Sequence, residues 1–248
     1  VLSKQIQIMR KFGLIGFPLT HSFSKSYFQE KFFKENIHDC QYENYPIEDI
    51  KTVKSLLEKE NLSGFNITIP HKEKIISFLD KLSPEANAIG AVNTVVKKDE
   101  KWIGHNTDWI GFYESIKPLL QKHHKKALVL GSGGASKAIV YALKNLDIEH
   151  LIISRKEGYI NYTEITKDLL AEYLIIVNCT PLGTFQKIDE YPNIPYKLLL
   201  KKHLLYDLTY NPSESRFLTY GKANETNIKN GLEMLQRQAE LAWNIWNS

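Results

Sequence analysis

Polar side chains gather in four short strings in the first half of the chain, and each string lies beside a glycine or a proline. Each falls where an expected strand ends and a loop or helix begins, which is where open α/β sheets bind their ligands. Hydroxyls, amides, one ammonium and one carboxylate that converge there would suit a small polyhydroxylated anion. The strings are residues 16–24, 65–72, 91–94 and 104–108, and their polar side chains include those of Ser22, Ser24, Asn66, Thr68, Lys72, Asn93 and Asp108.

Each string also has a purely structural explanation, which is a helix cap or a turn. Ser24, Thr107 and Asp108 are all good N-cap residues, whose side-chain oxygen accepts a hydrogen bond from a backbone N–H of the helix. For any single string this explanation is the simpler one. Four such strings in one half of a chain favour a binding site.

A different kind of chemistry is indicated by the glycine-rich string 131–136, which lies between an expected strand and an expected helix. In that context backbone N–H groups approach a pyrophosphate, and the helix N-terminus favours its negative charge. The string reads Gly-Ser-Gly-Gly-Ala-Ser and predicts a nucleotide site, although Ser136 stands where the dinucleotide fingerprint has Gly or Ala. S-adenosylmethionine and a flavin are the competing occupants of such a loop.

The residues after the next expected strand bear on the choice of cofactor. NAD-binding chains usually place an acid there to bind the ribose 2′-OH, whereas NADP-binding chains supply cations. Here the strand is followed by Arg155 and Lys156, which could pair with a 2′-phosphate through a planar guanidinium and a point charge. Glu157 on its own would favour NAD. Two cations ahead of one acid favour NADP.

The elements that must position these strings alternate between short β-branched runs and helical periodicity, which is typical of βαβ units and a largely parallel sheet. The pattern predicts an α/β protein. Expected strands cover residues 12–16, 41–47, 64–69, 90–97, 102–104, 127–130, 151–154, 174–178 and 203–208. Expected helices cover residues 24–36, 48–60, 72–82, 109–121, 135–146 and 232–246.

Composition sets outer bounds on what the protein can be. The 248 residues allow one large domain or two, and 43% hydrophobic with 24% charged residues excludes disordered and fibrous chains. No run approaches the roughly 20 apolar residues that a membrane span needs. A net charge of +4 is too small to predict a nucleic-acid partner but fits a small anion.

Several segments are expected to carry no chemistry. Cys40 and Cys179 lack metal-ligand spacing and a disulfide framework, which makes a reducing cytoplasm the expected location and a metal site unexpected. Residues 1–8, ahead of Met9, lack the features of a signal peptide and are expected to be dispensable. The basic run 122–126 is expected to be a solvated linker.

A set of ordered motifs resembles those of the shikimate dehydrogenase family, NADP-dependent enzymes that reduce 3-dehydroshikimate to shikimate on the route to aromatic amino acids. The resemblance runs from about Phe12 to the C-terminus. In the first half the motifs are Gly13-Leu-Ile-Gly16-x-Pro18 with His21-Ser22-x-Ser24, Asn66-x-Thr68-x-Pro70-x-Lys72, Gly90-Ala-Val-Asn93-Thr94 and Asn106-Thr-Asp108-x-x-Gly111. In the second half they are Gly131–Ser136, Val177-Asn-Cys-Thr180-Pro-Leu-Gly183, Asp207-x-x-Tyr210-x-Pro212 and Gly231-x-x-Met234-Leu-x-x-Gln238-Ala.

The resemblance implies a role for each candidate residue. Lys72 and Asp108 would be the catalytic pair: Lys72 stabilises the growing oxyanion and supplies the proton, while Asp108 orients Lys72 and bonds the substrate hydroxyl. The alternative for this pair is a surface salt bridge. Ser22, Ser24 and Tyr210 would bind the substrate carboxylate, and Asn66, Thr68, Asn93 and Gln238 the carboxylate edge or the ring hydroxyls. The cofactor would be held by Gly131, Ser132, Gly133, Gly134, Ala135, Ser154, Arg155, Lys156, Thr180 and Gly231.

The resemblance also implies an architecture. Residues 1–107 would form a substrate-binding catalytic domain with a mixed, mainly parallel sheet, completed by C-terminal helices in 223–248. Residues 108–222 would form a doubly wound Rossmann domain for NADP, with the active site in the cleft between the domains. The expected partner is the small-molecule substrate, with no nucleic acid and no membrane, in a monomer or a homodimer.

The chain departs from the family pattern in three places. Lys25 stands where the family commonly has Pro, which predicts a local effect only. Ser154 and Lys156 flank Arg155 where the family usually has Asn and Thr or Ser, which weakens the expected preference for NADP over NAD. The interval 156–174 is too short for the usual helix, strand and helix, so its first helix is predicted to be lost or reduced to a turn.

Three alternative functions stay open on the sequence. One is a paralogue that acts on quinate or another cyclohexane acid and tolerates NAD, against which the retention of both Ser22 and Ser24 argues. The others are a methyltransferase and a non-catalytic nucleotide-binding regulator. Neither of these would need the pair Lys72 and Asp108.

Overall fold

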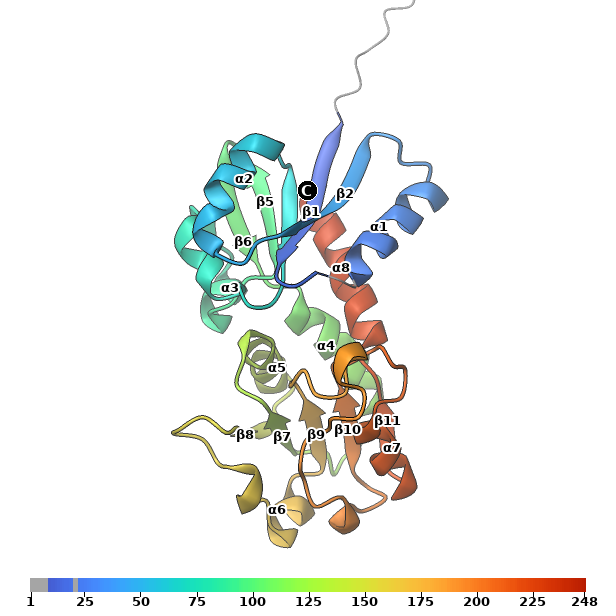
Figure 1. Cartoon of the computed structure of the whole chain (residues 1–248). Helices are drawn as coiled ribbons and strands as arrows, with labels where there is room; N and C mark the ends of the chain where they lie inside the picture. Colours follow the sequence, from blue (N-terminus) through green and yellow to red (C-terminus); the bar gives the residue numbers. More distant parts are fainter. Residues whose placement is uncertain (1–8, 20–21) are drawn as a thin grey trace, which may run out of the picture. The chain divides into compact units, whose positions relative to one another are not determined.

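The computed structural model describes residues 9–19 and 22–248 and divides the chain into two compact units (Figure 1). The first unit runs to Thr107 and is completed by Ala239–Ser248, and the second unit is Asp108–Gln238. The return to the first unit therefore begins inside the last helix and not at residue 223, because residues 216–229 pack against the second sheet. The expectations for residues 1–8 and for His21 lie outside the described residues.

The first unit is built on a mixed sheet of six strands in the order β2-β1-β3-β5-β6-β4. Strand β1 pairs in parallel with β2 and β3, β5 pairs antiparallel with β3 and β6, and β4 pairs in parallel with β6. This confirms the mixed, mainly parallel sheet. The strands are β1 (Arg10–Gly16), β2 (Cys40–Pro46), β3 (Gly64–Ile67), β4 (Lys81–Leu82), β5 (Thr94–Lys98) and β6 (Lys101–His105), and the helices are α1 (Phe23–Lys34), α2 (Val53–Glu60) and α3 (Pro84–Ile89).

Alternating side chains of this sheet supply two cores, one on each face. Ile15 and Ile67 pack with residues of α2 and α3 on one face, whereas Phe12 and Leu14 pack with α1 and the last turns of α8 (Leu232–Trp246) on the other. The second core closes at the indole of Trp246, whose Nε1–H donates to the Val95 carbonyl at 3.0 Å.

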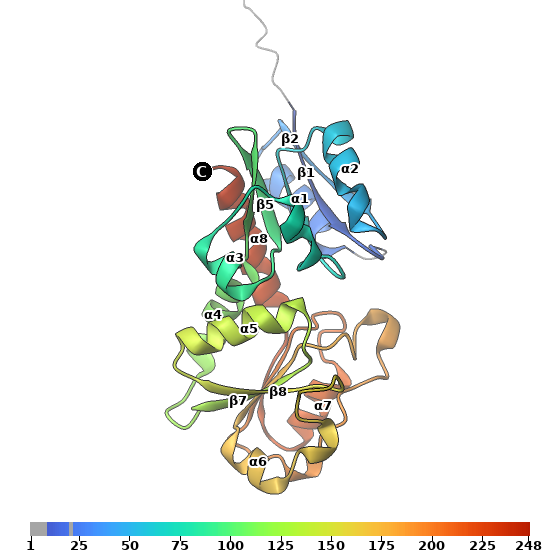
Figure 2. The same ribbon diagram turned by 90° about the vertical axis from the view of Figure 1, so that its left-hand side faces the viewer.

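The second unit is a doubly wound α/β domain with a parallel sheet of order β11-β10-β9-β7-β8. Figure 2 shows α4 and α5 on one side of this sheet and α6 and α7 on the other. Its strands are β7 (Lys126–Leu130), β8 (Glu149–Ile153), β9 (Ile175–Asn178), β10 (Leu204–Asp207) and β11 (Asn227–Lys229), and its helices are α4 (Asp108–Ile116), α5 (Gly134–Asn145), α6 (Lys167–Glu172) and α7 (Arg216–Ala223). No helix in the described ranges is long and apolar enough to cross a membrane.

The helix expected at 72–82 is wrong. A short 3₁₀ helix occupies Lys74–Phe78, β4 follows, and the α-helix α3 begins only at Pro84. The start of α3 is explained by Ser83, whose side chain accepts a hydrogen bond from the Ala86 N–H at 3.1 Å. A serine cap followed by proline at the first helical position strongly favours the start of a helix. The expected helix at 72–82 does not take this pattern into account.

The short interval after β8 folds as predicted, without its first helix. Residues 155–160 form a tight loop in which Ile160 bridges back to Ile153, and Gly158 adopts φ +84°. The basic run 122–126 is only partly a solvated linker. His124 is 3% exposed, with its ring accepting from the Gln121 N–H and bonding the Lys202 carbonyl at 3.0 Å.

Candidate functional site

The first of the polar strings starts α1. Ser22 is the N-cap of this helix, and its Oγ accepts a hydrogen bond from the Lys25 N–H at 3.2 Å. A proline at position 25 has no N–H, so the departure at this position is what makes this bond available. The Lys25 ammonium also pairs with Glu43 at 2.6 Å. Ser22 keeps its own proton to donate, whereas Ser24 is buried two residues further on, in the first turn of α1.

The second and third strings meet in a buried amide network on the first sheet. Asn66 on β3 donates from Nδ2 to the Asn93 carbonyl and to Thr94 Oγ1, both at 3.1 Å. The side-chain amide of Asn93 in turn bonds to Thr107. Its Oδ1 accepts from the Thr107 N–H at 2.7 Å, and its Nδ2 donates to Thr107 Oγ1 at 2.9 Å. All four side chains are at most 5% exposed.

The loop that carries Lys72 is held by backbone bonds on both sides. The Thr68 N–H donates to the Ile15 carbonyl at 2.9 Å, and the Lys72 carbonyl accepts from the Val92 N–H at 2.8 Å. The buried ring of His71 bonds through Nε2 to the Ile47 carbonyl at 2.6 Å, which ties the loop to the end of β2. Lys72 itself is half-buried. Its backbone is thus fixed one residue away from Asn93.

In the second unit the glycine loop joins β7 to α5 in the way a pyrophosphate site requires. Gly131 has φ +105°, a left-handed conformation that favours glycine. Gly133 has ordinary backbone angles, and among the described residues, apart from its two chain neighbours, none has an atom within 4 Å of where its Cβ would stand. Neither backbone strain nor packing by the chain itself therefore demands glycine at 133. The remaining reason is the close approach of a bound group at the start of the 12-residue helix α5, which fits a dinucleotide phosphate.

The loop after β8 is hydrogen-bonded to this glycine loop. Ser132 and Ser154 bond through their hydroxyls at 2.9 Å, and the Lys156 N–H donates to Ser154 Oγ at 3.2 Å. Arg155 and Lys156 are exposed, in the tight loop that replaces the missing helix. Two cations therefore stand beside the turn that would hold the phosphates, a donor set that fits NADP.

Asp207 is a buried hub at the carboxyl ends of β9 and β10. Its Oδ1 accepts from Asn178 Nδ2 and from the Thr209 N–H, both at 3.0 Å, and its Oδ2 accepts from the Ser215 hydroxyl. Asn178 then holds Thr180, whose hydroxyl donates to Asn178 Oδ1 at 2.6 Å. Burial raises the pKa of Asp207 to about 6 despite these donors. Asp207 thus orders the loops that carry Thr180 and Tyr210.

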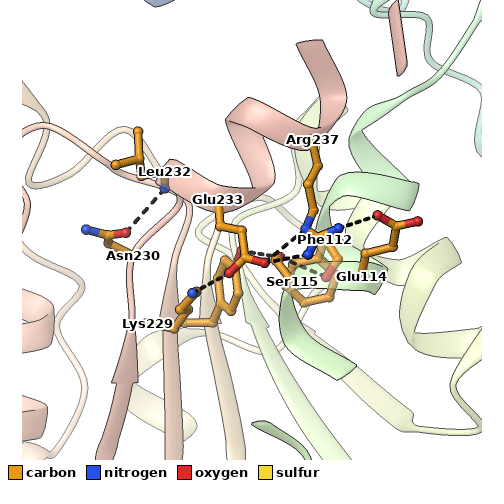
Figure 3. Close-up of polar contacts among 9 residues, drawn as sticks. Phe112, Glu114, Ser115, Lys229, Asn230, Leu232, Glu233 and Arg237 are labelled. Atoms are coloured by element: carbon orange, nitrogen blue, oxygen red, sulfur yellow. Dashed lines mark hydrogen bonds and ion pairs between the residues drawn. The ribbon is translucent and has the colours of Figure 1, made fainter. Parts of the chain in front are cut away.

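A chain of ion pairs, here called the relay, holds the start of α8 against α4 (Figure 3). Glu233 accepts from Lys229 at 2.6 Å and from Arg237 at 2.8 Å, and Arg237 reaches Glu114 at 2.7 Å. These partners hold the pKa of Glu233 below its ordinary value. The relay sets the position of the helix that carries Gln238.

Glycines explain two close approaches around the same helix. A Cβ at Gly111 would stand 2.6 Å from the Met234 carbonyl oxygen, so glycine lets α4 pack closely on α8. A Cβ at Gly231 would stand 2.2 Å from the Leu208 carbonyl oxygen, so close packing alone explains the glycine at this position.

Tyr210 is half-buried, and burial raises its pKa.

The structure links some of the predicted residues and leaves others in separate units. Asn66 and Asn93 share one network, and Thr180 belongs to the network of Asp207. Lys72 belongs to the first unit and Asp108 to the second. Two further residues of these networks are not among the predicted site residues. Asp207 lies in a motif without a predicted role, and Tyr42, which bonds Asn66, lies in no motif. Among the described residues, no group of three or more His, Cys, Asp or Glu is placed to hold a metal ion.

Comparisons with known proteins agree with this arrangement. A family model described as "Shikimate dehydrogenase substrate binding domain" matches residues 14–95. A protein of Dictyoglomus thermophilum named "Shikimate dehydrogenase (NADP(+))" is 38% identical over 254 residues, which cover 95% of this chain and 90% of that protein. The chain belongs to the shikimate dehydrogenase family. A second member, from Staphylococcus aureus strain MSSA476, is 38% identical over 96% of this chain and 92% of its own length.

Solved structures of shikimate dehydrogenases share the fold of the chain. The Aquifex aeolicus enzyme superposes with a TM-score of 0.87 at 32% identity, covering 96% of this chain and 92% of its own. The Thermus thermophilus enzyme, solved in complex with NADP(H) and shikimate, gives a TM-score of 0.84 at 30% identity over 96% of this chain and 93% of its own. Both the fold class and the family expected from the motifs are therefore confirmed.

Proposed function

We propose that the chain catalyses the reversible NADPH-dependent reduction of 3-dehydroshikimate to shikimate, a step of aromatic amino-acid biosynthesis. Family membership over almost the whole chain supports this activity. The structural observation that carries the proposal is the pair of backbone anchors around Asn93. Val92 holds the loop of Lys72, and Asn93 itself holds Thr107, the residue before Asp108.

Lys72 and Asp108 carry the reaction in this proposal. NADPH, when bound, supplies the hydride that reduces the substrate carbonyl. Negative charge then grows on the carbonyl oxygen, where the Lys72 ammonium stabilises it and donates a proton. Asp108 orients Lys72 and accepts a hydrogen bond from the substrate hydroxyl. In the reverse direction Lys72 takes the proton back.

The remaining polar side chains bind and orient the substrate. Ser22, Ser24 and Tyr210 donate hydroxyl hydrogen bonds to its carboxylate, which two or three donors satisfy well. Asn66, Thr68, Asn93 and Gln238 recognise the carboxylate edge or the ring hydroxyls. In this assignment residues 1–107 with the end of α8 are the substrate-binding domain.

The second unit is the NADP-binding domain in this proposal. The backbone N–H groups of Gly131–Ala135 bind the pyrophosphate at the start of α5, and Thr180 and Gly231 belong to the loops at the same edge of the sheet. Arg155 and Lys156 pair with the 2′-phosphate, and Ser154 holds their loop against Ser132. We place the enzyme in the cytoplasm, in keeping with its biosynthetic role.

The experiment that tests this function follows nicotinamide absorbance with shikimate and with quinate, each against NADP and NAD. We expect shikimate with NADP to give the highest kcat/KM of the four combinations. The NAD arm is needed because the Listeria monocytogenes relative was solved with shikimate and NAD. A higher kcat/KM with quinate would mean that quinate is the substrate, and a higher kcat/KM with NAD would mean that NAD is the cofactor. The absence of any turnover would overturn the proposal.

A further inference from the structure

Tyr42 lies at the meeting point of two of the proposed substrate-binding side chains. It stands on β2, is 1% exposed, and donates its hydroxyl proton to Asn66 Oδ1 at 2.8 Å. Ser24 lies near the same hydroxyl, close enough for its side chain to lower the pKa of Tyr42 against the effect of burial. The buried Tyr42 oxygen therefore bonds the asparagine on β3 and lies beside the serine at the start of α1.

The register of the sheet explains how this contact forms. Tyr42 pairs with Phe12 and Asn66 pairs with Leu14, so both side chains point to the sheet face that α1 and the end of α8 cover. The Tyr42 hydroxyl reaches across β1 to Asn66. Its ring is fixed by stacking on Phe28, with centroids 4.6 Å apart.

The hydrogen bonds around Asn66 determine how its amide faces. The Asn93 carbonyl can only accept, so the amide must present Nδ2 to it and Oδ1 to Tyr42. The second N–H of Asn66 donates to Thr94 Oγ1, and the Thr94 hydroxyl donates in turn to Asn93 Oδ1 at 3.2 Å. Both amide protons and one lone pair of Asn66 are thus engaged within the protein. Asn66 can offer a ligand an acceptor, which suits a substrate hydroxyl and not a carboxylate.

The single hydroxyl proton of Tyr42 also determines how Ser24 can interact with it. Tyr42 has one proton and gives it to Asn66, so its oxygen can only accept from Ser24. In the proposed function the Ser24 proton is the one that the substrate carboxylate accepts. Asn66 has no equivalent alternative, because the chain surrounds it with its own donors and acceptors.

We propose that Tyr42 is a positioning residue for substrate recognition, and that its hydroxyl fixes the orientation of the Asn66 amide and holds Ser24 beside it. This inference rests on the proposed function, since it assigns the side chains that Tyr42 holds to shikimate. It extends that function by adding a residue that touches neither substrate nor cofactor.

The test is Tyr42→Phe, which deletes the hydroxyl and keeps the ring that packs on Phe28. We expect KM for shikimate to rise about tenfold, with kcat and KM for NADP within twofold of the parent. The matched control is Tyr206→Phe in the second unit. Tyr206 is equally buried, packs edge-to-face against Phe112 with centroids 4.8 Å apart, and bonds Ser115 Oγ at 2.7 Å. This variant should lose comparable thermal stability without a change in KM for shikimate.

Two further variants test the route through Asn66. Thr94→Val removes the acceptor of the second Asn66 proton and should raise KM for shikimate in the same direction, which also covers the case in which Tyr42→Phe fails to fold. In an Asn66→Ala background, Tyr42→Phe should add less than a twofold change in KM. A double-mutant cycle of this kind separates a coupled role from two independent ones.

The outcomes separate this inference from the proposed function. An active parent whose KM for shikimate is unchanged by Tyr42→Phe overturns the role of Tyr42 and leaves the function standing. Equal changes in Tyr42→Phe and Tyr206→Phe overturn it as well, because they reduce the effect to lost stability. A parent that neither oxidises nor binds shikimate overturns both.

Discussion

Asn93 Oδ1 accepts a 2.7 Å hydrogen bond from the backbone N–H of Thr107, and this bond joins the start of β5 to the residue that precedes Asp108. One residue earlier, the Val92 N–H holds the carbonyl of Lys72. The backbones that carry the two proposed catalytic groups are therefore fixed by adjacent residues of one buried segment. A single substitution there would disturb both groups at once.

Lys72 should account for most of the rate. Lys72→Ala removes the cation that stabilises the oxyanion and supplies the proton, so kcat should fall by about 10²–10⁴-fold. Affinity for NADP, measured by fluorescence titration, should stay within about twofold. The control is Lys74→Ala, because Lys74 is exposed on the adjacent 3₁₀ helix and should leave kcat unchanged. A Lys72→Ala variant that keeps most of its turnover would contradict the assignment.

Ser22 should contribute to both binding and stability, because the structure makes it the N-cap of α1. Ser22→Ala should raise KM for shikimate by about 10–100-fold, the usual effect of losing a hydrogen bond to a charged group. It should also lower the free energy of unfolding by about 1 kcal/mol. Ser83→Ala removes the equivalent cap of α3 and should reproduce only the loss of stability. A fall in kcat with unchanged KM would speak against substrate contact by Ser22.

Arg155 should determine the preference for the phosphorylated cofactor. Arg155→Ala should raise KM for NADP by about 10–100-fold, because a hydrogen-bonded charge pair with the 2′-phosphate is lost. KM for NAD should hardly change, so the NADP:NAD ratio of kcat/KM is the readout. Arg216→Ala serves as the control, since Arg216 is an exposed arginine of the same unit that pairs with Asp189. An unchanged ratio in Arg155→Ala would assign the selectivity elsewhere.

Much of the fold was predictable because its signals are local. An unbroken apolar run marks β7, a glycine turn follows, and the apolar stripe of α5 comes next, so this strand–turn–helix segment is visible within about twenty residues of sequence. The segment 72–82 misled because Ile75, Ile76 and Leu79 have helical spacing. The chain instead closes a 3₁₀ turn there and starts its helix at the Ser83 cap.

The candidate site was predictable only where the type of a residue and its motif indicate its chemical role. Lys72, Asp108 and the glycine loop do so, and their motifs carried the family assignment. Tyr42 does not, because its role depends on a hydrogen bond across β1 to a residue 24 positions away. Burial of the Asp207 carboxylate likewise emerges only when β9, β10 and the Ser215 loop come together.

Asp207 should make stability depend on pH. Burial raises its pKa from an ordinary 3.8 to about 6, so the folded chain binds this proton more readily than the unfolded chain. The corresponding stability is fully present below pH 3.8 and is lost as pH rises through about 6. Between pH 5 and pH 8 the loss should be about 1.4 kcal/mol, the free energy of one pKa unit.

Asp207→Asn isolates this contribution, because the amide oxygen can still accept from Asn178 and Thr209 while its N–H groups face Ser215 Oγ. The free energies of unfolding of parent and variant should be measured in urea at pH 5 and at pH 8. The variant should gain about 1.4 kcal/mol on the parent between the two values, since it has no proton to lose. A constant difference between parent and variant would mean that burial does not raise the pKa of Asp207 in the folded chain.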